Sequence, residues 1–399
     1  MKHGLMALAT CLMMGLGSGS VLAAQVKLGV LTDMSGTFSE LSGAGSVEAA
    51  RLAIEDFGGS VLGEKIELVS ADHQHKPDVA LNLARQWLDR EGVDVILDVP
   101  NSGIALAVAS LVKEKNRIAI YASAATDRLT EDSCTGSGLH WTFDSYSQTQ
   151  GAARALIERG LDKWFLLVAD YAYGHSMEKA MREAVAANGG KIVGAVRHPL
   201  GTMDFSSFLL QAQGSKANIV ALASGGNDTI TAIKQGREFG LQDSGVRMTS
   251  LLTFITDIHA LGLKDMQGLQ FVVPYYWDMD DQTRGFAKRF HETMKKMPSE
   301  AQAGVYSGVL HYLKAVKAVG SKDQAKVLEK MREMPVEDMF SRHGKLLPNG
   351  RMVHDMYLVE VKSPAESKYP WDYYKILSTI PADKAFRSLS ETTCPLVKK

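Results

Sequence analysis

Two short polar segments follow apolar runs in this sequence, and both have the composition of loops that hold a small anion. The run from Val93 to Val99 leads into Pro100-Asn101-Ser102-Gly103, and the run from Asn218 to Ser224 leads into Gly225-Gly226-Asn227-Asp228. At the carboxyl ends of parallel strands, free N–H groups and helix dipoles attract negative charge. Ser, Asn and Asp at such points are also common helix N-caps, which is their more frequent role. The pattern alone therefore predicts either two half-sites facing one cleft or two ordinary caps.

The familiar catalytic and metal-binding motifs are absent or incomplete. Glu48 stands where Gly43-Ala44-Gly45 would need a later glycine to pack a dinucleotide-binding helix. His73-Gln74-His75 follows a predicted strand without an obvious third ligand, so a solvated turn is favoured over a metal site. His175 has no accompanying nucleophile in a recognisable motif, and neither a G-x-S-x-G elbow nor a phosphate-binding loop occurs after the leader. We expect no enzymatic activity, no cofactor and no metal.

The elements that position these segments alternate short apolar or β-branched runs with helical patterns. Such alternation is typical of a mainly parallel sheet covered by helices on both faces. The first set of predicted strands is Val26 to Met34, Lys65 to Asp72, Val93 to Val99 and Arg117 to Ala122. The second set is Trp164 to Asp170, Lys191 to Val196, Asn218 to Ser224 and Arg247 to Leu252. We therefore predict an α/β protein with two doubly wound parallel-sheet lobes.

Beyond the second set of strands, the chain is expected to cross between the lobes twice more, giving three hinge crossovers. Three helical patterns lie between Gln282 and Met334, with too few strands for a third domain of the same kind. These helices are therefore expected to return to the first lobe. Two β-rich runs, Met356 to Val361 and Tyr373 to Ile380, add strands to the second lobe. The predicted boundaries are residues 25–143 with 275–350 for lobe 1, and 144–274 with 351–399 for lobe 2.

The first residues have the basic, apolar and small-residue order of a secretory signal peptide. Lys2 precedes an apolar run from Leu5 to Leu16, and Ala23-Ala24 stands at the expected cleavage point. The run is shorter than the roughly 18 to 20 residues of a spanning helix, and Cys11 lies too early for a lipoprotein. We predict that residues 1–24 are removed and that the mature protein lies in the periplasm.

Charge and cysteine content narrow the partners and the compartment. The 399-residue chain has 44 basic and 45 acidic residues with no long run of either sign, so neither nucleic acid nor an anionic membrane surface is indicated. Cys134 and Cys394, both in polar, turn-like settings, are the cysteines that remain after the leader. An even pair in an oxidising compartment predicts a disulfide, the alternative being two unrelated buried thiols.

Six short motifs occur in a fixed order between residues 26 and 378. They are Met34-Ser35-Gly36, Pro100-Asn101-Ser102-Gly103, Ala124-Ala125-Thr126, Asp170-Tyr171-Ala172-Tyr173-Gly174, Asp204-Phe205-Ser206-Ser207 and Gln302-Ala303-Gly304-Val305-Tyr306. Their joint order resembles the type I periplasmic solute-binding proteins of the branched-chain amino acid (leucine/isoleucine/valine-binding) ABC transporter family. The resemblance implies a receptor that closes around a small molecule and then docks on an ABC permease in the inner membrane. A periplasmic ligand sensor of the same fold is the alternative.

The resemblance also implies roles for individual residues. Ser102 and Thr126 would hold the ligand carboxylate from lobe 1, and Tyr173 would close over it from lobe 2. Asn227 or Asp228 would supply a further contact, with the correspondence uncertain by one residue.

One family feature has no counterpart in this chain. The family places an acidic residue after the next strand to neutralise the ligand ammonium, but Thr249 to Phe254 contains no acid. An ammonium group buried without a counter-charge would be costly, so an aromatic or other organic carboxylate is favoured over a branched-chain amino acid. Asp228, Asp257 and Glu40 remain as alternative partners for an ammonium.

The chain is therefore more similar to the aromatic-acid-binding branch of the family, in which rings line the site. About half of six aromatic residues are expected to supply such ring contacts. The six are Phe38, Tyr173, Phe254, Tyr275, Tyr276 and Trp277.

Overall fold

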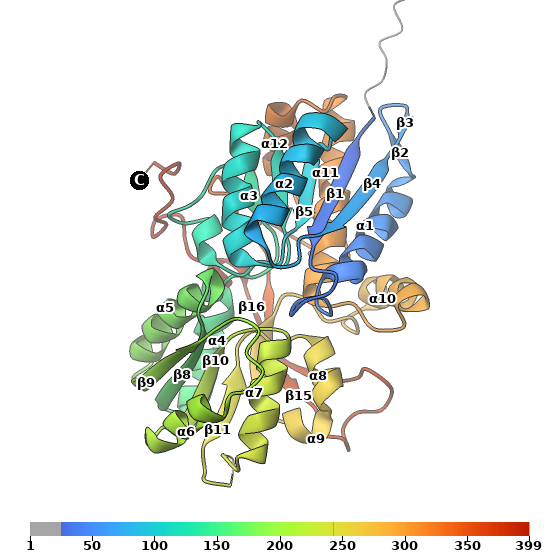
Figure 1. The fold of residues 1–399 in the computed structure, drawn as a ribbon. Coiled ribbons are helices and arrows are strands. Elements are labelled where there is room, and N and C mark those ends of the chain that lie inside the picture. Colours follow the sequence, from blue (N-terminus) through green and yellow to red (C-terminus); the bar gives the residue numbers. More distant parts are fainter. Residues whose placement is uncertain (1–24, 242, 399) are drawn as a thin grey trace, which may run out of the picture.

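The computed structural model describes residues 25–241 and 243–398, which form two lobes, each built on its own parallel sheet (Figure 1). The predicted leader, residues 1–24, lies outside the described residues. The first sheet has the strand order β4-β1-β5-β6-β7 and the second has the order β11-β10-β8-β9. Neighbouring strands are parallel throughout both sheets. The predicted α/β fold class with two doubly wound lobes is confirmed.

The observed strands follow the β-branched and apolar runs of the sequence closely. The first sheet contains β1 Lys27–Thr32, β4 Glu67–Asp72, β5 Val95–Asp98, β6 Ile118–Tyr121 and β7 Gly138–His140. The second sheet contains β8 Lys163–Ala169, β9 Lys191–His198, β10 Ile219–Ala223 and β11 Arg247–Ser250. Two short hairpins are formed by β2 Ser60–Val61 with β3 Glu64–Lys65, and by β13 Lys345–Leu346 with β14 Met352–Val353.

The central strands are apolar on both faces because helices cover both sides of each sheet. On β5, Val95 and Leu97 pack into one core while Ile96 packs into another. This is the expected pattern for a buried parallel sheet, whose strands read as nearly continuous hydrophobic runs. The helices of the first lobe are α1 Gly43–Phe57, α2 Pro77–Gln86 with a π-helical turn Trp87–Glu91, α3 Ser102–Glu114, α10 Asp281–Met294, α11 Glu300–Val319 and α12 Gln324–Glu333.

The second lobe combines its parallel sheet with a smaller antiparallel one. Strands β12 Gln270–Val273, β15 Met356–Val361 and β16 Tyr374–Ile380 form this sheet. It packs on α4 Ser145–Glu158. The other helices of the lobe are α5 Ala172–Ala187, α6 Ser206–Gly214, α7 Asn227–Glu238, α8 Ile255–Leu261, α9 Leu263–Met266 and α13 Ala382–Ala385.

The chain passes between the lobes after β7, after β12 and again before β15 (Figure 1). The first and third passages lie side by side. The buried Arg351 guanidinium donates to the Thr142 carbonyl at 2.7 Å, and His354 Nε2 lies 2.7 Å from the same oxygen. An ion pair of 3.5 Å between Arg351 and Asp144 joins the same two segments. These contacts hold the first and third passages against each other.

The C-terminal segment returns to the first lobe. Cys134 and Cys394 are joined by a disulfide with their Cα atoms 5.7 Å apart. The Thr393 N–H also donates to the Glu131 carboxylate at 2.7 Å. The last residues therefore pack on the loop after β6, although the strands just before them belong to the second lobe.

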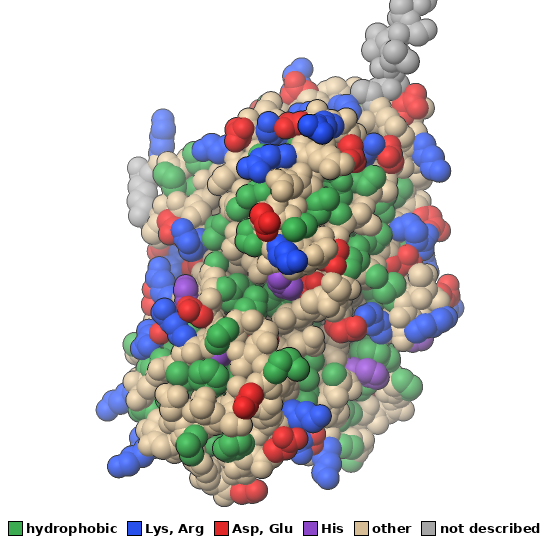
Figure 2. Space-filling model, viewed as in Figure 1, with side chains coloured by type: hydrophobic (Ala, Val, Ile, Leu, Met, Phe, Trp, Pro, Cys, Tyr) green, Lys and Arg blue, Asp and Glu red, His purple; other side chains and the backbone are tan. Residues whose placement is uncertain are grey.

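The surface carries both charge signs, and no helix among the described residues is long and apolar enough to cross a bilayer. Figure 2 shows basic and acidic side chains interspersed over the visible face of both lobes. This distribution agrees with the balanced composition of the chain.

Candidate functional site

The loops at the carboxyl ends of the strands in the two sheets meet in direct contact. The Asn227 N–H, at the start of α7, donates to the Thr37 carbonyl of the first lobe at 3.3 Å. Thr126 Oγ1 of the first lobe lies 2.6 Å from Ser176 Oγ of the second lobe. Ligands of open α/β sheets bind outside these strand ends. We call this contact region the interlobe site.

Ser102 occupies the first position of α3 and is buried in this region. Its Oγ accepts a hydrogen bond from the Ala125 N–H at 3.3 Å, and its own O–H donates to no described residue. The neighbouring Asn101 is the helix cap, because its Oδ1 accepts from the Gly103 and Ile104 N–H groups at 3.0 and 3.1 Å. The two roles considered for this loop, helix cap and ligand contact, thus fall on neighbouring residues. Asn101 caps the helix, and Ser102 retains a hydroxyl donor.

The turn that presents Ser102 has an unusual backbone. Asp98 and Val99 have φ angles of 80° and 56°, in the left-handed region that disfavours a β-branched residue. The buried Asp98 carboxyl accepts hydrogen bonds from Thr32 Oγ1 at 2.6 Å and from the Ser123 hydroxyl. Burial raises the pKa of Asp98 to about 6, against the effect of these bonds. The network links the ends of β1, β5 and β6 and holds the turn in place.

Thr126 is also buried at the interlobe site, but its hydroxyl is engaged with Ser176 of the opposite lobe. Thr126 precedes a short 3₁₀ turn, Asp127–Leu129. Ser176 lies on α5, three residues after Tyr173, so the two side chains share a face of the helix. Ser176 was not among the predicted site residues, although this spacing was a signal that could have found it. The bond between Thr126 and Ser176 ties the lobes together next to the predicted carboxylate-binding residues.

Tyr173 is almost completely buried, and its hydroxyl has no hydrogen-bond partner among the described residues. An unpaired buried polar group costs about 1 to 3 kcal/mol. Such groups are rare in folded proteins, so each one needs a specific explanation. Burial also raises the pKa of Tyr173 above its usual range, so the hydroxyl remains a protonated donor.

The six aromatic residues considered from the sequence divide between two cores. One core contains residues of both lobes at the interlobe site, and its members from the six are Phe38, Tyr173 and Phe254. The remaining three, Tyr275, Tyr276 and Trp277, pack in the other core near the second crossing. Tyr275 stacks on Phe340 with ring centroids 6.3 Å apart, and its buried hydroxyl also lacks a partner among the described residues.

Asn227 and Asp228 have different surroundings. The Asn227 side chain is exposed, and only its backbone takes part in the contact with the first lobe. The buried Asp228 carboxylate accepts from the Gly201 N–H at 3.0 Å. Burial raises the pKa of Asp228 to about 6, while the Gly201 bond and the nearby His75 lower it. Asp228 is therefore the member of this pair whose side chain is buried, and its hydrogen bond lies within the second lobe.

The predicted turn is present at Gln74 and His75, but it is only partly solvated because β4 ends at the interlobe site. His73 is fully buried, and burial lowers its pKa to about 4. His75 Nε2 lies 2.5 Å from the buried Asp33 carboxylate, and its ring meets Phe38 edge-on at 4.9 Å. Burial alone would raise the pKa of Asp33, but its hydrogen bonds with His75 and the backbone lower it to about 2. Asp33 thus stays charged at neutral pH.

Two further buried acids, Asp257 and Glu300, have raised pKa values. Asp257, in the first turn of α8, accepts from the Phe254 N–H at 2.9 Å, and burial raises its pKa to about 7. Burial also raises the pKa of Glu300, at the start of α11, and the charge of Asp257 adds to this effect. Asp257 was considered from the sequence, whereas Glu300 was not. No group of three potential metal ligands occurs among residues 25–241 and 243–398.

The fold defines a two-lobed α/β protein in which loops at the strand ends of two parallel sheets meet. Residues 25–368 match the family model described as periplasmic binding protein, and the chain belongs to this family. It is the periplasmic substrate-binding component of an ABC transporter.

Three solved structures illustrate the similarity. A periplasmic binding protein from Burkholderia mallei is 47% identical, with a TM-score of 0.92 over 94% of this chain and 99% of that chain. A branched-chain amino acid ABC transporter periplasmic ligand-binding protein from Burkholderia xenovorans is 48% identical, with a TM-score of 0.83 over 94% and 100% of the two chains. A solute-binding protein from R. palustris in complex with benzoate is 23% identical, with a TM-score of 0.81 over 94% and 100%. The predicted family is confirmed.

Proposed function

We propose that this protein captures a small organic carboxylate, with an aromatic acid favoured, between its two lobes and delivers it to an ABC permease in the inner membrane. The observation that carries the proposal is the Tyr173 hydroxyl, which is buried among residues of both lobes without a hydrogen-bond partner among the described residues. A ligand carboxylate placed against Tyr173 and Ser102 would satisfy both donors. Hydrogen bonds to a charged acceptor are stronger than those to a neutral one.

The charges around the interlobe site favour an acid over an amino acid. Asp228 already accepts a backbone hydrogen bond from Gly201, and burial raises its pKa to about 6. A carboxyl group with a raised pKa is a poor counter-ion, because part of it is neutral near pH 7. On the first lobe, the His75 ring is held by the charged Asp33 and packs against Phe38.

The apolar wall of the site suits a ring. Phe38 and Phe254 come from different lobes and share one core with Tyr173. Aromatic rings prefer offset or edge-to-face contacts with centroids about 4.5 to 7 Å apart, and the Phe38 and Tyr171 rings already lie at 6.4 Å. Closing the lobes around a benzoate-like acid would bury the ring between these side chains and its carboxylate against the hydroxyl donors.

A branched-chain amino acid is the second candidate. It is favoured by the pair of buried acids Asp257 and Glu300, because an ammonium group beside them would supply the missing positive charge. The similarity to the Burkholderia xenovorans protein points the same way. The two candidates differ in charge at one end of the ligand, so they can be separated by direct binding.

A thermal-shift screen of benzoate, cinnamate, leucine, isoleucine and valine tests the proposal. A ligand present at 100 times its dissociation constant adds about 2.7 kcal/mol to the free energy of unfolding. We expect the aromatic acids to raise the melting temperature more than the amino acids at equal concentration. Stabilisation by the amino acids alone would replace the first candidate with the second.

A further inference from the structure

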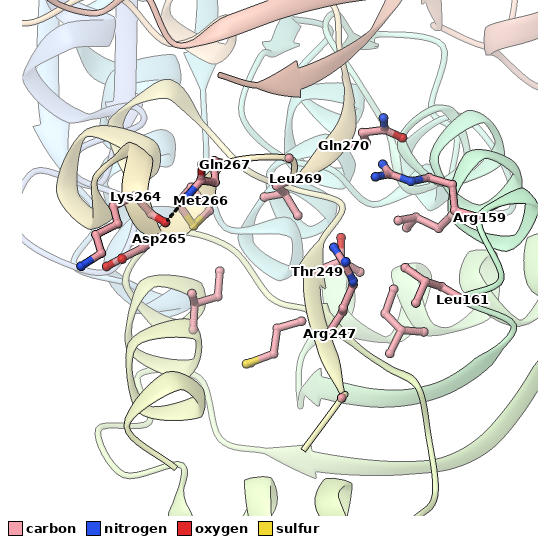
Figure 3. A pocket seen from close by; sticks show the side chains of 16 residues that line it. Arg159, Leu161, Arg247, Thr249, Lys264, Asp265, Met266, Gln267, Leu269 and Gln270 are labelled. Carbon is pink, nitrogen blue, oxygen red and sulfur yellow. Dashed lines mark hydrogen bonds between the residues drawn. The ribbon is translucent and has the colours of Figure 1, made fainter. Parts of the chain in front are cut away.

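A separate pocket of about 550 Å³ lies in the second lobe, and it shares no lining residue with the interlobe site described above (Figure 3). Its volume falls within the range of about 300 to 1,000 Å³ that is usual for small-molecule sites. The pocket lies between β11 and β12, which are the edge strands of two different sheets. The end of α4 and the short helix α9 close its sides.

The floor of the pocket is apolar. Four buried side chains contribute to it, namely Leu156, Ile219, Ile233 and Met266. Met248 and Leu269, which are partly buried, extend this surface toward the rim. The pocket can therefore hold an apolar group of several carbon atoms out of water.

One side of the pocket is cationic. Figure 3 shows the guanidinium groups of Arg159 and Arg247 on the same side, close to Thr249. Arg247 forms no ion pair with another described residue, and Arg159 has only a 3.8 Å approach to Glu360. The acid that lines the opposite wall, Asp265, is already paired with an arginine of α7. Positive charge is therefore in excess on this side of the pocket.

The Thr249 hydroxyl, next to the two arginines, is a second and independent observation at the pocket. Its side chain is only 1% exposed, and Oγ1 has no hydrogen-bond partner among residues 25–241 and 243–398. Thr249 lines the pocket on the side of the two guanidinium groups. Buried hydroxyl groups are almost always bonded, so the position favours an acceptor from a bound molecule.

We propose that this pocket is a second binding site, for a small amphipathic carboxylate. Arg247 and Arg159 hold the carboxylate, the Thr249 hydroxyl donates to it, and the apolar body of the ligand covers the floor formed by Ile219 and Met266. This site is distinct from the solute site between the lobes and does not depend on the identity of the transported solute.

Calorimetric titration with octanoate tests the proposal, using Arg247→Leu and Thr249→Val as pocket variants. Arg154→Leu is the matched control, because Arg154 is an exposed arginine near the same end of α4 whose charge is paired with Glu158. We expect octanoate to bind the natural protein at one site, with the dissociation constant raised at least tenfold by Arg247→Leu and severalfold by Thr249→Val. The control should bind octanoate like the natural protein.

Ser102→Ala separates this site from the one between the lobes. Octanoate affinity should be unchanged in Ser102→Ala if the pocket is the site. Loss of octanoate binding in Ser102→Ala with retention in Arg247→Leu would overturn the proposal, and so would the absence of binding to the natural protein. Melting temperatures of all variants should match that of the natural protein, which shows that each change in affinity is local.

Discussion

Replacement of Tyr173 by Phe should separate ligand affinity from folding stability. The Tyr173 hydroxyl is buried and unpaired among the described residues, so removing it takes away no hydrogen bond from the ligand-free protein. An unpaired buried hydroxyl carries a penalty of about 1 to 3 kcal/mol, part of which the variant escapes. We expect the free energy of unfolding of Tyr173→Phe to stay within about 0.5 kcal/mol of the natural value or to rise.

The same change should weaken ligand binding. If the hydroxyl donates to a carboxylate, the lost bond is worth about 1.5 to 3 kcal/mol. At about 1.4 kcal/mol per factor of ten, the dissociation constant rises roughly 10- to 150-fold. Urea unfolding measures the first quantity, and calorimetric titration with the identified ligand measures the second.

Tyr121→Phe is the matched control. Tyr121 is also fully buried, and its hydroxyl lacks a partner among the described residues, but its ring packs in the core around α3. The control should leave affinity unchanged. A dissociation constant for Tyr173→Phe within twofold of the natural value would refute the role given to Tyr173. A loss of more than about 2 kcal/mol in stability would show instead that the hydroxyl has a structural partner.

Three further changes have defined outcomes. Ser102→Ala should raise the dissociation constant for the ligand by a similar factor, corresponding to about 1.5 to 3 kcal/mol, with little effect on unfolding, and calorimetry would contradict this by showing unchanged affinity. Replacing Cys134 and Cys394 together with Ser opens a loop of 260 residues, which in the chain-entropy model lowers the free energy of unfolding by roughly 5.5 kcal/mol. Two free thiols in the natural exported protein, measured by mass spectrometry without reductant, would contradict the disulfide. Asp257 has a pKa of about 7 in the folded protein, above the unfolded value of about 4, so stability is lost as pH rises from 4 through 7. Asp257→Asn keeps an acceptor for the Phe254 N–H and removes this loss, which amounts to on the order of 4 kcal/mol at pH 8. The same pH dependence of unfolding in the natural protein and in Asp257→Asn would refute the role given to Asp257.

The strands were predictable because their local sequence is distinctive. Buried parallel strands read as continuous apolar runs, and the run from Val93 to Val99 contains the observed β5. The run from Met356 to Val361 coincides with β15. The sequence did not indicate that β12 leaves the parallel sheet and pairs with β15, because pairing partners are set by the approach of distant segments.

The candidate site was predictable where the fold alone determines position. Ser102 follows a strand in the sequence, so it lies at the carboxyl end of the sheet and therefore at the interlobe site. The partners of such residues were not predictable, because they come from distant segments. His75 meets Asp33 across 42 residues, and Thr126 meets Ser176 across 50. The spacing on α5 could place Ser176 beside Tyr173, but it could not show that Ser176 contacts Thr126 of the other lobe.

Calorimetric titration of the natural protein with cinnamate, benzoate and leucine tests the central claim most directly. The geometry of Ser102 and Tyr173 predicts that an aromatic acid binds with one molecule per chain and more tightly than leucine, and that the acid is recovered chemically unchanged. Tight binding of leucine with no heat from either aromatic acid would contradict the claim that the interlobe site is built for an organic acid without an ammonium group.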